Sequence, residues 1–359
     1  MKAPSLVLVA LTTAASVSAQ DTSRVAEAQS VLAPLIESYG VSGMETPVRA
    51  AVQKLLPAWA KTETDTAGNL WVRVGQGDPV IVFVAHLDEI GYRVDSILDD
   101  GSLRLLNQGG FFQSLFEAEP ALVHTPKGDV PAVFLPRDTG TTHHNPPPVR
   151  ASVGTTSRQG TLALGVSVGS TVTMPKQFTR LAGTRATGRA MDDRVGDAAQ
   201  ILALRHLDRS KLKHQVIFLF STREEIGLDG ARAAANALGT TPRRVHAIDT
   251  FVSADSPLEL QTFATAKLGD GPVARSLDNS SVTPAAYVDS LVQVARARGV
   301  PLQVGTTNGG NDGSTFTPFG VVDVAMGWPL RYSHSPAEVV DLRDVAALAD
   351  LVQAIAEIW

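Results

Sequence analysis

The sequence of 359 residues contains no cysteine. This absence excludes disulfide bonds, a lipid-anchored cysteine and thiolate ligands, so a metal site must use His, Asp or Glu. The chain also has no large excess of positive or negative residues, because its formal net charge is only −5. So mild a charge argues against nucleic acid as a partner. With 44% hydrophobic residues, the chain is typical of a globular protein held together by a large core.

Hydrophobic runs that could span a bilayer, which takes about 20 residues, are missing as well. The first residues, MKAPSLVLVALTTAASVSAQ, place one lysine before a short apolar run and then small residues. This order is typical of a secretory signal peptide, so we expect residues 1–19 to be removed by cleavage after Ala19. An ordinary N-terminal helix or an uncleaved anchor is the alternative. The sequence thus predicts a secreted or periplasmic protein without membrane contact after cleavage.

Apolar runs typical of strands buried on both faces alternate with segments of helical periodicity. The runs are PVIVFVAH, HQVIFLFS, RVHAIDTFVSAD and GVVDVAMGWPL, preceded by the strand-like NLWVRVG. The helical segments are 193–207, 230–238, 285–298 and 342–358, with two more helices within 23–60. This alternation predicts an α/β fold with a mostly parallel sheet and flanking helices.

Between about 94 and 183 the sequence changes to short β-rich runs separated by glycine and proline, without an amphipathic helix. We expect this part to be a small β-barrel-like domain, inserted into a catalytic domain made of residues 20–93 and 184–359. Its expected role is oligomerisation or a lid over the site.

Residues able to bind metals cluster where the predicted strands end, which is where open α/β sheets bind their ligands. They are His86, Asp88, Glu89, Asp192, Asp193, Glu224, Glu225, Asp249, Asp255 and His334. Most also have a structural interpretation, as helix caps, acidic helix starts or hydrogen-bonded histidines. Asp249 is harder to explain in that way, because a carboxylate inside an apolar strand needs a partner.

Six motifs occur in the order AHLDEIG, GRAMDDRVG, TREEIGLDGAR, AIDTFVSAD, GGNDGS and RYSHSPAEVVDLRD. With them, the sequence resembles the tetrahedral aminopeptidases, the glutamyl-aminopeptidase-like group of dinuclear zinc metallopeptidases also called cellulase M. The resemblance runs from about Ser23 to the C-terminus. It implies a zinc-exopeptidase α/β domain with an inserted β domain. It also implies an enzyme that removes N-terminal residues from peptides.

The resemblance further implies a site with two divalent metal ions. One ion would be bound by His86 and Asp249, the other by Glu225 and His334, and Asp192 would bridge both. Zn²⁺ is the expected metal, and Co²⁺ or Mn²⁺ would suit the same mixture of histidines and carboxylates.

Roles in catalysis and substrate binding follow from the same resemblance. Glu224 is implied to be the general base that activates a metal-bridged water. Asp88 is implied to orient a histidine ligand through its carboxylate. The GGNDGS segment is implied to lie near the substrate, which makes Asn311 and Asp312 candidate binding residues. Arg331 is a third, as a clamp for a substrate carboxylate or as a structural partner.

Three other functions stay open. A related dinuclear carboxypeptidase or deacylase would use the same metals, and end-specificity would distinguish it from an aminopeptidase. The segment GVSVG matches the nucleophile elbow of a serine hydrolase with Ser167 as nucleophile, but β-branched residues and a proline follow it instead of a helix. A non-catalytic binding ectodomain is the third, although every implied ligand is present. In relatives the inserted domain commonly carries dimer contacts, so the resemblance also implies a homo-oligomer.

Overall fold

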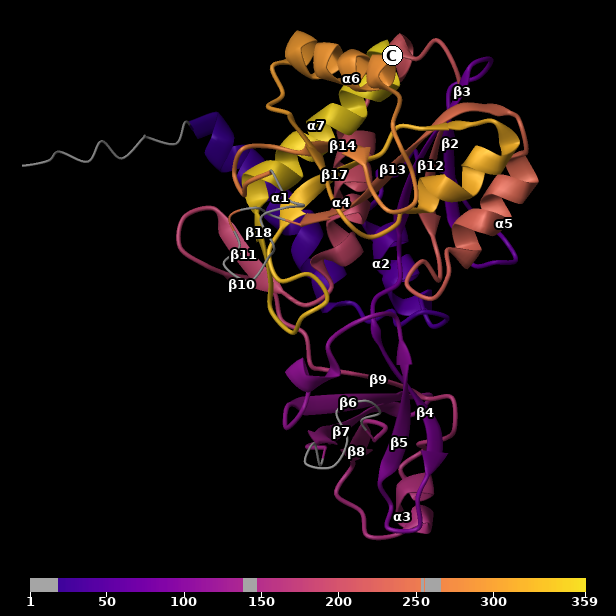
Figure 1. Cartoon of the computed structure of the whole chain (residues 1–359), viewed down its shortest axis with the longest axis vertical. Helices are drawn as coiled ribbons and strands as arrows, with labels where there is room; N and C mark the ends of the chain where they lie inside the picture. Colours follow the sequence, from indigo (N-terminus) through magenta and orange to yellow (C-terminus); the bar gives the residue numbers. More distant parts are fainter. Residues whose placement is uncertain (1–18, 138–146, 253–254, 256–265) are drawn as a thin grey trace, which may run out of the picture.

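The computed structural model describes residues 19–137, 147–252, 255 and 266–359 (Figure 1). The predicted signal peptide therefore lies outside the described residues, except for Ala19, where the first helix begins. Two bodies are visible in Figure 1, an α/β layer above and a small barrel below it. Among the described residues, no helix is both long enough and apolar enough to cross a membrane.

A mostly parallel sheet forms the centre of the upper body, in the order β1-β2-β12-β3-β13-β17-β14-β15, with β16 beside β13. Its four central strands, β12, β3, β13 and β17, run parallel. Every residue of β3 and β12 is buried, because their sequences are continuous apolar runs. The strands are β1 Thr62–Thr64, β2 Leu70–Val74, β3 Val80–His86, β12 Val216–Ser221, β13 Pro242–Val252, β14 Val273–Leu277, β15 Gln303–Thr306, β16 Val322–Asp323 and β17 Met326–Leu330.

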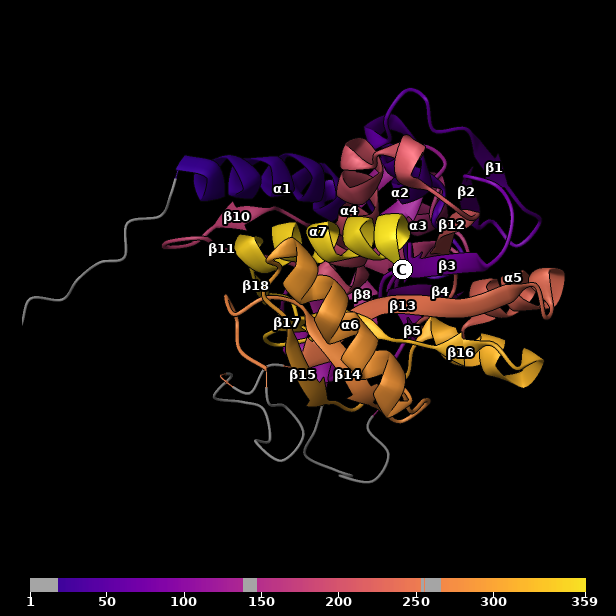
Figure 2. The same ribbon diagram turned by 90° about the horizontal axis from the view of Figure 1, so that it is seen from above.

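Helices cover both faces of this sheet, as the alternating sequence predicts (Figure 2). On one face α1, α4 and α7 pack against one another and share the largest hydrophobic core with the sheet. On the other face, a smaller core joins α5 and the 3₁₀ helix η3 to the sheet. The helices are α1 Ala19–Glu37, α2 Thr46–Leu55, α4 Met191–His206, α5 Asp229–Leu238, α6 Ala285–Arg298, α7 Leu342–Ile358, η2 Arg209–Lys211 and η3 Asp312–Phe319. This arrangement confirms the predicted fold class.

The lower body is a closed six-stranded barrel with its own hydrophobic core, in the order β4-β5-β8-β7-β6-β9. It confirms the predicted barrel-like insertion, although the first strand starts at Gly91, upstream of the expected boundary. The short helix α3 was not predicted, because it buries only Thr161 and so lacks an apolar pattern. The elements are β4 Gly91–Ile97, β5 Leu103–Gln108, η1 Gln113–Leu115, β6 Pro120–Thr125, β7 Gly128–Leu135, β8 Arg150–Ser152, α3 Arg158–Ala163 and β9 Thr171–Thr173.

The GVSVG segment lies in the loop between α3 and β9. Within the described part of the chain, no histidine or carboxylate is hydrogen-bonded to the Ser167 hydroxyl. That hydroxyl lies 3.3 Å from the hydroxyl of Ser170, which also accepts the backbone N–H of Ser167. A nucleophile elbow requires a strand, a sharp turn and a helix, and this loop has none of that order. The structure therefore gives no support to the serine-hydrolase alternative.

The return from the barrel passes through a small three-stranded sheet, β10 (Thr179–Arg180), β11 (Arg185–Gly188) and β18 (Glu338–Asp341). Gly188 of β11 pairs with Glu338 of β18. This pairing brings the chain segment that leads into α4 next to the segment that follows His334.

A buried group of charges joins the two bodies where the chain passes between them. Glu89 accepts hydrogen bonds from Lys176 at 2.8 and 3.0 Å and pairs with Arg189, while Arg194 lies 3.5 Å away. Arg189 also donates to the carbonyl of Ile90, next to the start of the barrel. Burial alone would raise the pKa of Glu89, but the three positive charges lower it to about 2. The carboxylate is thus ionised and fully paired.

Candidate active site

Strand ends from the parallel sheet meet at one edge, where a cavity of about 330 Å³ opens. His86 is the last residue of β3 and pairs in register with Ser221, the last residue of β12. Glu224 and Glu225 follow β12, and Asp249 lies near the end of β13. Asp192 is the second residue of α4, and its peptide bond to Asp193 is cis. The cavity is lined by Asp192, Glu224, Glu225, Asp249 and His334, among others.

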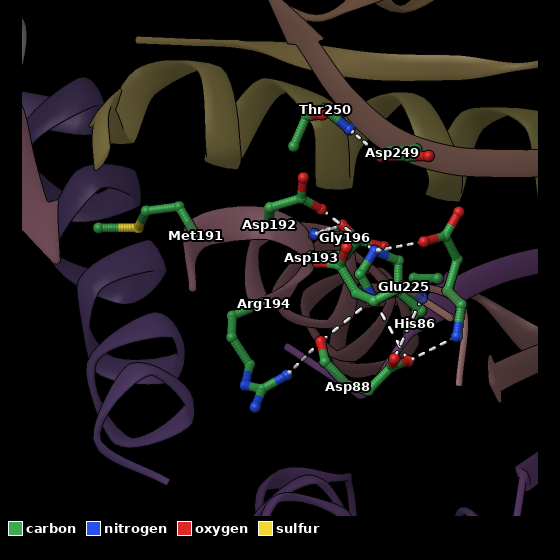
Figure 3. A network of polar contacts seen from close by, with 12 residues as sticks. His86, Asp88, Met191, Asp192, Asp193, Arg194, Gly196, Glu225, Asp249 and Thr250 are labelled. Carbon is green, nitrogen blue, oxygen red and sulfur yellow. Dashed lines mark hydrogen bonds and ion pairs between the residues drawn. The ribbon is translucent and has the colours of Figure 1, made fainter. Parts of the chain in front are cut away.

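Asp192 lies at the centre of the site (Figure 3). Its Oδ1 is 3.1 Å from Nε2 of His86, and its Oδ2 is 3.3 Å from Nε2 of His334. The two oxygens of one carboxylate therefore face two different histidines. Asp192 therefore links the two histidines through one side chain.

Glu225 completes the group around His334. Its Oε2 lies 3.4 Å from Nε2 of that histidine, and it forms with His86 and Asp192 a set whose donor atoms all lie within 4.8 Å of one another. Its other oxygen, Oε1, is buried and has no hydrogen-bond partner among the residues that the structure describes. An unpartnered carboxylate oxygen beside two imidazole nitrogens suits a divalent cation, so the residues present fit metal ions.

Asp249 lines the same cavity but is paired differently. Its Oδ1 accepts the N–H of Thr250 at 2.6 Å, and its Oδ2 lies 3.3 Å from Arg275. Among the described residues it makes no hydrogen bond or ion pair with the other four predicted ligands. Burial raises its pKa to about 6, against the opposing charge of Arg275. The partner that an aspartate in this strand requires is therefore present in Arg275.

Backbone carbonyls orient both histidines. Nδ1 of His334 lies 2.6 Å from the carbonyl oxygen of Gly110, in a loop of the barrel, and Nδ1 of His86 lies 3.2 Å from that of Asp88. Since a carbonyl only accepts, each Nδ1 carries a proton, and each Nε2 faces Asp192. No sequence pattern predicted the role of Gly110, because its contact with His334 joins two bodies that are far apart in the chain.

The carboxylate of Asp88 lies at ion-pair distance from the His86 ring and also binds the backbone of the glutamate pair. Its Oδ1 lies 3.6 Å from Nδ1 of His86 and accepts the backbone N–H of Glu224 at 2.9 Å, while its Oδ2 accepts that of Glu225 at 3.2 Å. The hydroxyl of Ser42 donates as well, at 2.6 Å. Asp88 therefore holds the glutamate pair by its backbone, and its carbonyl orients His86.

Glu224 borders the cavity with 14% of its side chain exposed and lies 3.9 Å from Nε2 of His86. Burial is the main cause that raises its pKa well above the ordinary value. The negative charges of Asp249 and Glu225 act in the same direction, against the charge of His86. A carboxyl group that takes up a proton readily at a cavity wall is suited to acid–base chemistry.

The three predicted substrate residues do not line the cavity. The Asn311 amide is fully buried and donates to Asp278, while its oxygen caps η3 through the N–H of Gly313. Asp312 is buried and accepts the hydroxyl of Ser221. Arg331 is paired with Asp255 at 2.8 Å. Instead, the preceding residues Asn308, Gly309 and Gly310 line the cavity, together with Phe111 and Phe112 from the barrel.

The model of the M42 glutamyl aminopeptidase family matches residues 68–351. The chain belongs to this family. It is 31% identical to the lysyl aminopeptidase of Pyrococcus furiosus, over 90% of this chain and 95% of the relative. It is 25% identical to the glutamyl aminopeptidase of Lactococcus lactis subsp. cremoris, over 89% and 93%.

Solved structures agree with this assignment. The TET1 peptidase of Pyrococcus horikoshii superposes with a TM-score of 0.83 at 30% identity, covering 94% of this chain and all of that one. As a member of the M42 family, the protein is a peptide hydrolase, and the family implies the use of divalent metal. The predicted family and enzyme class are therefore confirmed.

Proposed function

We propose that the protein is an aminopeptidase with two divalent metal ions that removes residues from the N-terminus of peptides. The observation that carries the proposal is the position of Asp192, whose two oxygens face His86 and His334 separately. His86 and Asp249 would hold one ion, and Glu225 and His334 the other. The unpartnered Oε1 of Glu225 supports this arrangement.

Bound in this way, the ions would polarise the scissile carbonyl and make the attacking water more acidic. Glu224 takes the proton of that water and then delivers it to the leaving amine. Its position at the cavity wall and its raised pKa support both steps. Asp88 keeps Glu224 and Glu225 in place, because it binds their backbone N–H groups.

Attack at the N-terminus is favoured over attack at the C-terminus. A carboxypeptidase needs a free cation to bind the terminal carboxylate, and the candidate Arg331 is already paired with Asp255. Arg275, the arginine of the cavity wall, is held between Asp249 and Asp278 at 3.3 and 2.9 Å. The carboxylates of the cavity suit a free α-amine instead.

The experiment uses purified protein on free and N-acetylated aminoacyl chromogenic substrates and short peptides. Activity is measured as isolated, after chelation, and after Zn²⁺, Co²⁺ or Mn²⁺ is restored. We expect cleavage of the free-amine substrates alone, lost on chelation and regained with metal. Cleavage from the C-terminus or of acylated substrates would favour a carboxypeptidase or deacylase, and cleavage indifferent to chelator would contradict a metal mechanism. No cleavage despite bound metal would support a binding protein.

We also propose a homo-oligomer. The TET1 peptidase of P. horikoshii can assemble into a tetrahedron or a large octahedral shell. Sedimentation of the purified protein tests the assembly, and a monomer at micromolar concentration would contradict it.

For localisation we propose export by way of the N-terminal segment, residues 1–19, on the sequence pattern alone. N-terminal sequencing of the protein from cell fractions tests this. We expect exported protein beginning at Gln20, whereas intact Met1 in the cytoplasmic fraction would overturn the proposal.

A further inference from the structure

Buried carboxylates hold the backbone of the site together. Asp88 accepts the N–H groups of Glu224 and Glu225, and Asp193 accepts those of His86 and Gly196, both at 3.0 Å. Neither Asp88 nor Asp193 is one of the proposed metal ligands. Each binds the backbone of a proposed ligand, Glu225 or His86.

Glu338 is a third carboxylate of this kind and joins two distant segments. Its Oε2 accepts the N–H of Met191 at 2.6 Å and that of Asp192 at 3.4 Å. Its Oε1 accepts the N–H of His334 at 2.7 Å. Glu338 is only 2% exposed and is fixed by the pairing of β18 with β11. One side chain therefore links the backbone of Asp192 to that of His334.

The two linked segments have backbone conformations that need such support. Ala190 has a φ of 66°, Tyr332 of 62° and His334 of 58°. These values lie in the left-handed region, which costs a non-glycine residue about 1–2 kcal/mol. Such conformations persist where the surroundings fix them. The hydrogen bonds to Glu338 are the contacts that fix the backbone N–H of His334.

We propose that Glu338 is a positioning residue that sets the separation of Asp192 and His334 and so the affinity for the second ion, the one at Asp192 Oδ2, Glu225 and His334. The inference rests on the proposed two-metal function. The first ion depends less on Glu338, because His86 ends a buried strand and its N–H is held by Asp193. Loss of the link should therefore weaken one ion more than the other.

The test is the substitution Glu338→Gln, which keeps the size of the side chain but leaves only one acceptor atom. Its NH₂ group would face one of the donating N–H groups, so one segment loses its anchor. Glu357→Gln is the matched control, since Glu357 is also buried and accepts a backbone N–H, from Asp208 at 3.0 Å, at the far end of α7. His334→Ala identifies the signal of the second ion.

Binding is followed by titrating the metal-free proteins with Co²⁺ and recording the visible absorption bands. We expect E338Q to bind the second Co²⁺ about 10- to 100-fold more weakly, with the first affected less, and E357Q to match the wild type. Turnover of E338Q should recover at excess Co²⁺ while KM stays near the wild-type value. Wild-type affinity for both ions in E338Q would overturn the inference.

Two further outcomes are distinguishable. If the wild type itself binds fewer than two Co²⁺, or H334A binds as many as the wild type, the proposed two-metal function fails rather than the role of Glu338. If E338Q does not fold, Glu338→Asp replaces it, because the shorter carboxylate cannot reach both segments. Weaker binding of the second ion by E338D supports the inference, and unchanged binding contradicts it.

Discussion

The α/β layer and the barrel contribute to the site in different ways. The layer supplies all the predicted ligands, because parallel strands such as β3 and β12 end at one edge and are followed by polar residues. The barrel is antiparallel and partly exposed, with β7 largely open to solvent. It reaches the site through one loop, which places Gly110 against His334 and Phe111 and Phe112 in the cavity wall. Substitutions of site residues in the layer should thus abolish activity. Substitutions in the barrel should lower activity only when they lie near this loop.

The largest effect is expected for Glu224→Gln in the layer. The amide cannot take up the proton of the attacking water, so kcat should fall about 100- to 10,000-fold. Metal content, measured by mass spectrometry, should be unchanged, because Glu224 is not one of the proposed ligands.

Its counterpart in the barrel is Glu117→Gln, where Glu117 pairs with Arg137 at 2.5 Å away from the cavity wall. We expect nearly full activity for this control. Wild-type turnover in E224Q would contradict the assignment of the base.

The second effect concerns the junction of the two bodies. Glu89→Gln leaves Lys176, Arg189 and Arg194 buried without their carboxylate, which should lower the free energy of unfolding by about 3–5 kcal/mol. Urea unfolding at pH 7 measures this loss.

The pH dependence of this stability loss tests the charge of Glu89 directly. The pKa of Glu89 falls from 4.5 when unfolded to about 2 when folded. Its stabilisation is therefore complete above about pH 5 and is lost as the pH falls toward 2. The difference between wild type and E89Q should shrink from pH 7 to pH 3.5. A difference that stays constant with pH would contradict the role of its charge.

A third, smaller effect on activity is expected for a substitution in the barrel loop at residues 109–112. Gly109 has a φ of 98°, and a Cβ there would lie 2.6 Å from Ile90 and 3.3 Å from Oε2 of Glu225. Gly109→Ala should therefore shift the loop and lower kcat/KM by about 10- to 100-fold.

The matched control is Gly128→Ala in the β6–β7 turn, where φ is 115° and a Cβ would have no neighbour within 4 Å. It shares the backbone strain without the contact to the site, so it should lose stability but retain kcat/KM. Equal kinetic losses in both variants would show that strain in the barrel, not the loop, matters.

The smallest effect is expected for Ser167→Ala. Ser167 lies in a barrel loop, where its hydroxyl contacts that of Ser170, so activity should be unchanged and stability should change by less than about 0.5 kcal/mol. Loss of activity in S167A would revive the serine-hydrolase alternative.

The sequence predicted the layer well because buried parallel strands are continuous apolar runs, and their ends locate the polar residues. PVIVFVAH became β3, and the paired glutamates after HQVIFLFS line the cavity. The barrel was predicted as a class, but not α3, whose single buried residue leaves no periodic signal.

The sequence could not reveal contacts between segments far apart in the chain. The hydrogen bonds of Gly110 with His334 and of Glu338 with Met191 form only when the chain folds, and no local sequence pattern indicates them. The glycine-rich segment was correctly expected beside the cavity, but Gly309 and Gly310 line it, whereas Asn311 turns inward to cap η3. Which residue of a turn faces a cavity depends on its backbone angles, which composition does not encode.

The hydrogen bond from His334 to the Gly110 carbonyl also means that the barrel cannot be exchanged independently of the α/β layer. His334, a predicted ligand in the layer, is oriented by a carbonyl that belongs to the insertion. A hybrid that carries the barrel of a relative should therefore retain this protein's own barrel loop, residues 109–112, so that His334 keeps its partner. A substitution in that loop would alter the contact with His334 in the α/β layer. We therefore expect the loop and the residues around His334 to change together among relatives.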